Sequence, residues 1–182
     1  MEYIEKEQPE LAKKMSLIYL GAYVTNPLMM PKWDERSGKY MFVLPMSIEA
    51  RMPIIVPNQS TGPFVRALIE DEDAGKRLLA YDSYLQIGEV VEMWSRVAGT
   101  DAGFLQVSIE VMDAQFGIPV EVLDGPGFID EFGYMGGVES PIEPAQLKRR
   151  PRTKPFDEWL KERDWKEILD GGKVELKGVE GK

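Results

Sequence analysis

The sequence predicts an α/β domain with a mixed sheet and flanking helices. Short apolar segments bounded by Pro or Gly alternate with longer segments whose apolar residues recur at the helical period, which is typical of this class. Apolar residues make up 43% of the 182 residues, enough for a buried core. The length corresponds to one domain. We assign that domain to residues 1–169 and expect a flexible tail at residues 170–182.

The first third of the chain contains one helical and three strand patterns. Residues 2–14 are predicted to form a helix that Pro9 divides in two. The apolar run 15–24 is typical of a strand that is buried on both faces, as in a parallel sheet. Residues 40–46 and 52–57 are short apolar runs between Pro and Gly residues, which indicates two further strands.

The middle of the chain alternates between helix and strand. Residues 60–71 are predicted to form a helix and residues 77–83 a strand. The segment 86–99 has the clearest helical pattern, and Gly99 stands where a residue that ends a helix belongs. Its apolar stripe consists of Ile87, Val90, Val91, Trp94, Val97 and Ala98.

Outside the glycine-rich stretch 124–137, the last third is predicted to hold a strand and two helices. The strand covers residues 103–108, and Ser108 is suited to cap a helix that runs to Gly117. Residues 155–169 are predicted to form the last helix. The basic run at 148–154 contains Pro, and we interpret it as a solvated linker rather than a docking patch.

Composition excludes several classes of function. The chain has no Cys and no His, so it has no disulfide, thiolate nucleophile or Ser-His-Asp triad, and we expect no metal site. The net charge of −9 repels phosphate backbones, which argues against a nucleic-acid partner. No apolar run is long enough to span a membrane, and the charged N-terminus lacks a signal sequence, so we expect a cytoplasmic protein.

The glycine-rich stretch 124–137 poses the main question of chemistry. Gly125 and Gly127 fit the first two positions of a dinucleotide-binding loop, but Asp130 occupies the third. A carboxylate there would repel a pyrophosphate. We therefore expect Gly125 and Gly127 to break a helix, and the pair at 136–137 to end the next one.

Several segments together resemble the NmrA-like family. The strand at 15–24 ends in a Gly-x-Tyr-x-x-Asn pattern, here Gly21, Tyr23 and Asn26. "FIDEFGYMGG" and "FDEWLKERDW" resemble the C-terminal end of many fungal members. The resemblance extends over residues 1–169.

The resemblance implies a truncated or rearranged Rossmann-like domain. Members of the family are relatives of short-chain dehydrogenases, with an NADP-binding N-terminal half and a smaller C-terminal half. Our sequence resembles only the C-terminal half, so we expect no nicotinamide cofactor. The strand at 15–24 would then present an unpaired edge, which predicts a homodimer or another association that covers it.

The family's C-terminal half also supplies the substrate pocket. We therefore predict a cofactor-independent enzyme of fungal specialised metabolism that cyclises or isomerises a small apolar substrate or performs a cycloaddition on it. No catalytic residue is assigned, and any one aromatic or Met residue is more often part of a core than of a binding site. The alternatives are a regulatory protein that binds a partner, and a fragment of an NADP-dependent oxidoreductase. The predicted substrate-binding residues are Tyr23, Asn26, Met30, Trp33, Phe132 and Tyr134.

Overall fold

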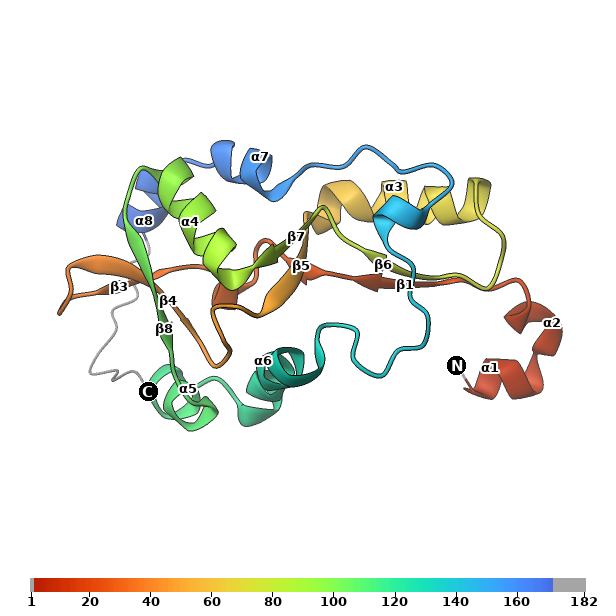
Figure 1. Ribbon diagram of the computed structural model, residues 1–182, viewed down its shortest axis with the longest axis horizontal. Helices are drawn as coiled ribbons and strands as arrows, with labels where there is room; N and C mark the ends of the chain where they lie inside the picture. The colour runs from red at the N-terminus through yellow and green to blue at the C-terminus, as the bar shows by residue number, and fades with distance from the viewer. Residues whose placement is uncertain (1, 172–182) are drawn as a thin grey trace.

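The structure is a computed structural model that describes residues 2–171, so the tail predicted at residues 170–182 lies almost wholly outside the described residues. The molecule is elongated, and helices lie on both sides of a central layer of strands (Figure 1). The predicted α/β class with mixed sheets and flanking helices is confirmed. The strands are β1 (Leu17–Leu20), β2 (Ala22–Tyr23), β3 (Lys32–Asp34), β4 (Lys39–Leu44), β5 (Arg51–Ile55), β6 (Arg77–Ala80), β7 (Ser83–Gln86) and β8 (Ala102–Gln106).

Helices α3, α4 and α7 lie on one side of the strands, and α5 and α6 lie on the other (Figure 1). The first predicted helix is divided near Pro9, as expected. The helices are α1 (Glu2–Glu7), α2 (Pro9–Ala12), α3 (Pro57–Glu70), α4 (Ile87–Ala98), α5 (Ile109–Phe116), α6 (Val120–Phe132), α7 (Phe156–Lys161) and α8 (Trp165–Gly171), with 3-10 turns η1 (Pro27–Met29) and η2 (Pro144–Gln146).

The strands form three small sheets with both parallel and antiparallel pairs. β1 pairs in parallel with β6. β5 lies between β2, which is parallel to it, and β7, which is antiparallel. β4 lies between antiparallel β3 and parallel β8. β1 and β2 belong to one chain segment, which changes its neighbour from β6 to β5 at Gly21.

Gly21 is required where this segment changes neighbours. A Cβ atom at this position would lie 2.7 Å from the backbone oxygen of Pro53 on β5. The backbone of Pro53 cannot move aside as a flexible side chain can. The two strands therefore lie so close together at this point that only glycine fits between them. The glycine of the Gly-x-Tyr-x-x-Asn pattern therefore has a packing role.

The edge of β1 differs in part from expectation. All four residues of the strand are half-buried, so the prediction of burial on both faces was wrong. β1 pairs with β6 along one edge, and within residues 2–171 no strand pairs with the other. The unpaired edge that we predicted is therefore seen in the described chain, and the association that would cover it stays a prediction.

The best helix signals in the sequence were reliable. Four residues of the predicted stripe of α4, Ile87, Val90, Val91 and Trp94, are buried, and Gly99 ends the helix in the left-handed conformation. Ser108 caps α5 by accepting a hydrogen bond from the backbone N–H of Val111 at 3.3 Å, and Gly117 ends that helix.

The predicted helix at 155–169 is two helices, α7 and α8. Asp164 causes the division, because its carboxylate accepts a hydrogen bond from the backbone N–H of Glu167 at 3.1 Å and so caps a new helix. The indole N–H of Trp165 donates to the carbonyl of Leu160 across the break. The polar segment between the helices is thus a structured turn.

Candidate functional site

An apolar cavity of about 390 Å³ lies between η1, the strands β4 and β5, and helix α6. Most of its wall consists of Leu, Met, Ile, Val and Pro side chains, and three polar residues interrupt it. Volume and lining are both typical of a site for a small organic molecule. The lining residues are Ala22, Asn26, Pro27, Leu28, Met29, Lys32, Leu44, Met46, Met52, Ile118, Val122, Gly125, Pro126, Ile129 and Tyr134.

Helix α6 forms the outer wall of this cavity, and it corrects one of our predictions. We expected Gly125 and Gly127 to break a helix, but α6 continues through both and ends at Gly133. The tertiary packing of Leu123, which is fully buried against α5 and β4, holds the helix despite its glycines. A Cβ atom at Gly125 would meet nothing within 4 Å, so the missing side chain leaves open space in the cavity wall.

Asp130 attaches the other end of α6 to the body of the protein. Its carboxylate accepts a hydrogen bond from the backbone N–H of Ser47 at 3.0 Å. The glycine stretch that resembles a dinucleotide-binding loop is therefore helical and anchored through its acidic residue. It presents no cradle of backbone N–H groups, so this stretch does not fit a pyrophosphate.

Asn26 lies at the cavity with a fixed amide. Its Oδ1 atom accepts a hydrogen bond from the backbone N–H of Leu28 at 3.0 Å and caps η1. That contact fixes the orientation of the amide and leaves its NH₂ group, a donor, for a ligand.

Tyr134 reaches the same cavity from the segment after α6. Its hydroxyl donates to the carbonyl of Leu20 at 2.8 Å, which joins the end of α6 to β1. Burial, assisted by the nearby Tyr23, raises the pKa of Tyr134 above its ordinary value, so the phenol is neutral at physiological pH. The Tyr134 oxygen can still accept a hydrogen bond from a ligand.

A second hollow of about 520 Å³ adjoins the cavity, and both are lined by Asn26 and Tyr134. Tyr23 lines the second hollow and is about half exposed. The structure thus brings together three of the six predicted binding residues, from positions more than 100 residues apart in the sequence.

The other three predicted residues lie elsewhere. Trp33 packs edge-on against Tyr40, with ring centroids 5.1 Å apart, and Met30 packs against the same core. Phe132 is exposed on the surface of α6 and contacts Phe128. None of the three lines the cavity.

Lys32 is a cavity residue that our sequence reading missed. It lies on β3, half-buried, with its ammonium 3.8 Å from the centroid of the Phe116 ring. Burial lowers the pKa of Lys32 below its ordinary value. The sequence did contain one indication of this role. Lys32 is the only charged residue in the apolar run "LMMPKW", and a charge in apolar surroundings destabilises a fold unless it has an interaction partner.

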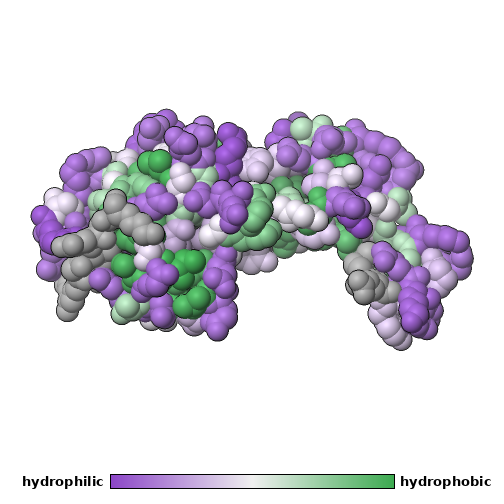
Figure 2. Space-filling model, turned by 60° about the horizontal axis from the view of Figure 1, so that its bottom comes forward, coloured by the Kyte–Doolittle hydropathy of each residue, from purple (hydrophilic) through white to green (hydrophobic). Residues whose placement is uncertain are grey.

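Hydrophobic side chains also gather outside the cavity. Figure 2 shows them on the face that carries α5 and α6, and Val120, Phe128 and Phe132 are exposed residues of α6 that do not line the cavity. Among residues 2–171, no group of Asp or Glu side chains is arranged to hold a metal ion. No helix of that part of the chain is long and apolar enough to cross a bilayer.

Comparison with known proteins decides the family. The model of the NmrA-like family matches residues 1–160. The chain belongs to this family. A search of curated proteins found no match.

Two solved structures share the fold. The crystal structure of NmrA, a negative transcriptional regulator, has a TM-score of 0.55 at 16% identity, covering 92% of our chain and 58% of NmrA. The complex of leucoanthocyanidin reductase with NADPH from Vitis vinifera has a TM-score of 0.55 at 16% identity, covering 81% of our chain and 51% of the reductase. The chain therefore spans little more than half the length of either protein.

Proposed function

We propose that this NmrA-like chain binds a small, mainly apolar molecule with one carbonyl group in the cavity behind α6, and that it isomerises or cyclises this molecule without a nicotinamide cofactor. The observation that carries the proposal is the apolar cavity with Asn26, Lys32 and Tyr134 at its wall. Few, well-placed polar groups in an apolar wall orient a ligand and strengthen electrostatic contacts to it.

Each polar residue has a role in this proposal. The amide NH₂ of Asn26 donates to the ligand carbonyl and stabilises the enolate that forms. Lys32, whose pKa burial lowers, takes a proton from the carbon next to the carbonyl and returns it at another carbon. The Tyr134 phenol accepts a hydrogen bond and fixes the orientation of the ligand. Such a shift needs no external oxidant or reductant.

Filling the cavity tests ligand binding. Gly125→Leu adds a side chain in open space within a helix, and Gly62→Leu adds the same side chain in open space on α3, outside the cavity. With Nile red as the neutral apolar probe, we expect Gly125→Leu to abolish saturable binding and Gly62→Leu to leave it unchanged. Equal binding by both variants would show that the probe is held elsewhere and would contradict the proposal.

Turnover is tested with a β,γ-unsaturated ketone, whose conversion to the conjugated ketone is followed by ultraviolet absorbance. We expect Lys32→Met to slow conversion by about 100-fold or more. Added NADPH should change neither the rate nor probe binding. A rate that requires NADPH would refute cofactor independence, and probe binding without turnover would favour the regulatory alternative.

We further propose that two copies associate along the open edge of β1. This proposal is supported by a half-buried strand whose second edge has no strand partner among the described residues. Light scattering after size exclusion measures the mass directly. A stable monomer at concentrations of about 100 μM would contradict the dimer, because standard protein interfaces bind more tightly than that.

A further inference from the structure

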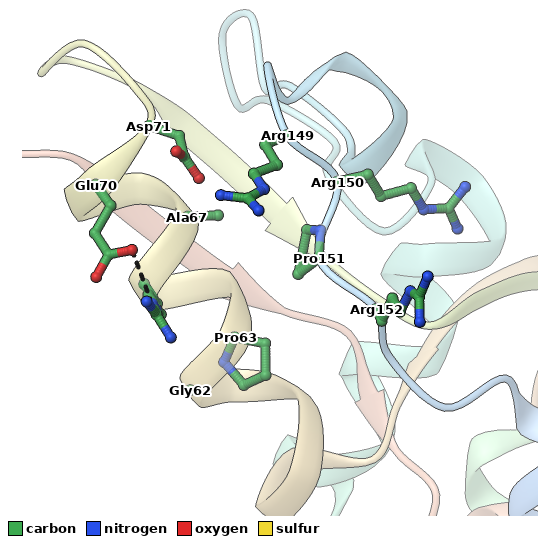
Figure 3. A pocket seen from close by; sticks show the side chains of 10 residues that line it. Gly62, Pro63, Ala67, Glu70, Asp71, Arg149, Arg150, Pro151 and Arg152 are labelled. Carbon is green, nitrogen blue, oxygen red and sulfur yellow. Dashed lines mark hydrogen bonds and ion pairs between the residues drawn. The ribbon is translucent and has the colours of Figure 1, made fainter.

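A third hollow, of about 750 Å³, lies between α3 and the basic segment of the chain (Figure 3). We call residues 149–152 the arginine segment. In Figure 3, this segment passes over α3, and the side chain of Arg149 points toward the end of the helix near Asp71, whereas Arg150 points away from α3. The hollow lies on the side of the strands opposite α6, so it is separate from the cavity already described.

The arginine segment is held at both ends. Just before it, the backbone N–H of Lys148 donates to Glu72 at 2.6 Å, and its ammonium pairs with Asp73 at 2.9 Å. Beyond it, Phe156 is buried and its backbone N–H donates to Ser83 at 3.0 Å. From the sequence we interpreted this run as a solvated linker, but its backbone is held in place at both ends. Because the backbone is already ordered before a ligand binds, the entropy cost of binding is lower.

The arginines of the segment are free for a ligand. Within residues 2–171, neither Arg149 nor Arg150 nor Arg152 forms an ion pair. The fourth arginine of the hollow, Arg66, already pairs with Glu70 at 2.8 Å. Three arginines without an ion pair among the described residues, within four consecutive positions, are unusual in a chain with a net charge of −9, where carboxylates are plentiful.

The floor of the hollow is small and apolar. α3 presents Gly62, Pro63 and Ala67 to it, so no large side chain fills the space. A Cβ atom at Gly62 would meet nothing within 4 Å. A planar or aliphatic group can rest on this floor while a charged group reaches the arginine segment.

We propose that this hollow binds a phosphate monoester of a small organic molecule. Arg149 and Arg152 hold the phosphate through charge-assisted hydrogen bonds, which suit the fork of a guanidinium and a dianion with several oxygens. The organic part rests on Pro63 and Ala67. The inference does not depend on the proposed isomerase or cyclase function.

Phenyl phosphate is the probe, titrated by calorimetry at low salt. We expect saturable binding that inorganic phosphate competes away. Arg149→Gln and Arg152→Gln should each weaken the affinity about tenfold, since a hydrogen bond to a charged group contributes about that factor. Arg96→Gln is the matched control, because Arg96 is exposed on α4 and forms no ion pair with the described residues.

Two further arms make the test decisive. Gly62→Glu places a carboxylate in the open space of the hollow and should abolish binding, with an unchanged circular dichroism spectrum. Benzoate, with the same ring and a single charge, should bind at least about tenfold more weakly than phenyl phosphate. The proposal would be overturned if benzoate bound as tightly as phenyl phosphate, or if the arginine variants bound phenyl phosphate as tightly as Arg96→Gln does. It would also be overturned if binding showed no saturation by about 20 mM phenyl phosphate.

Discussion

Substitution of Leu123 by Ala tests whether α6 is packed as a wall of the cavity. Leu123 is fully buried against Val43, Val107 and Met112. Loss of its branched end removes about 2.4 kcal/mol of transfer free energy, at about 0.8 kcal/mol per carbon. A residual cavity of roughly 50 Å³ adds about 1.2 kcal/mol. We therefore expect a loss of about 3 to 4 kcal/mol in the free energy of unfolding.

Urea denaturation followed by far-ultraviolet circular dichroism measures this change. Val120→Ala is the control, because Val120 lies on the same helix, is exposed and does not line the cavity. The control should cost about 0.5 kcal/mol or less. If Leu123→Ala costs no more than Val120→Ala, α6 is not docked on the sheet, and the reasoning that builds the cavity from it fails.

Two further predictions concern other parts of the fold. Gly21→Ala should cost about 1 to 3 kcal/mol in unfolding experiments, because its Cβ would meet the Pro53 backbone. Gly62→Ala should instead stabilise α3 by about 0.5 to 1 kcal/mol, and similar effects of both substitutions would refute the close approach of the strands. Burial and a hydrogen bond to Glu143 raise the pKa of Tyr81 to about 12. The stability that Tyr81 contributes relative to Tyr81→Phe should thus be complete below about pH 10 and be lost as the pH rises through about 12. In an ultraviolet titration, Glu143→Gln should lower the pKa of Tyr81 only partly, because burial is the larger cause of the raised pKa. Ionisation of Tyr81 at the same pH as the exposed tyrosines would contradict this prediction.

Local signals in the sequence predicted the elements that local chemistry determines. α4 and α5 begin and end as expected because their caps and C-terminal glycines, Gly99 and Gly117, act within one turn of the chain. α6 was mispredicted because its glycines weaken a helix locally, whereas the burial of Leu123 stabilises it through residues far along the chain. The division between α7 and α8 was predictable in principle, since Asp164 is a good capping residue.

The candidate site was less predictable than the fold. Tyr23 and Asn26 are close in sequence, and the family resemblance singled them out, but only the tertiary fold brings Tyr134 to them. Lys32 was missed because β3 is too short to show a strand pattern, so nothing local indicated which way its side chain points. Side chains that meet across the fold depend on packing that a single sequence does not display.

The aromatic contacts determine what spectroscopy of this protein reports. All four tryptophans belong to one chain of rings: Trp33 contacts Tyr40, Tyr40 contacts Trp94, and Trp165 lies between Trp94 and Trp159. Intrinsic tryptophan emission therefore comes entirely from the end of the molecule where α7 and α8 dock on α4. The end built from β1, β6 and α3 contributes no tryptophan emission. Unfolding of that end alone would therefore not be detected in an experiment that followed only tryptophan fluorescence.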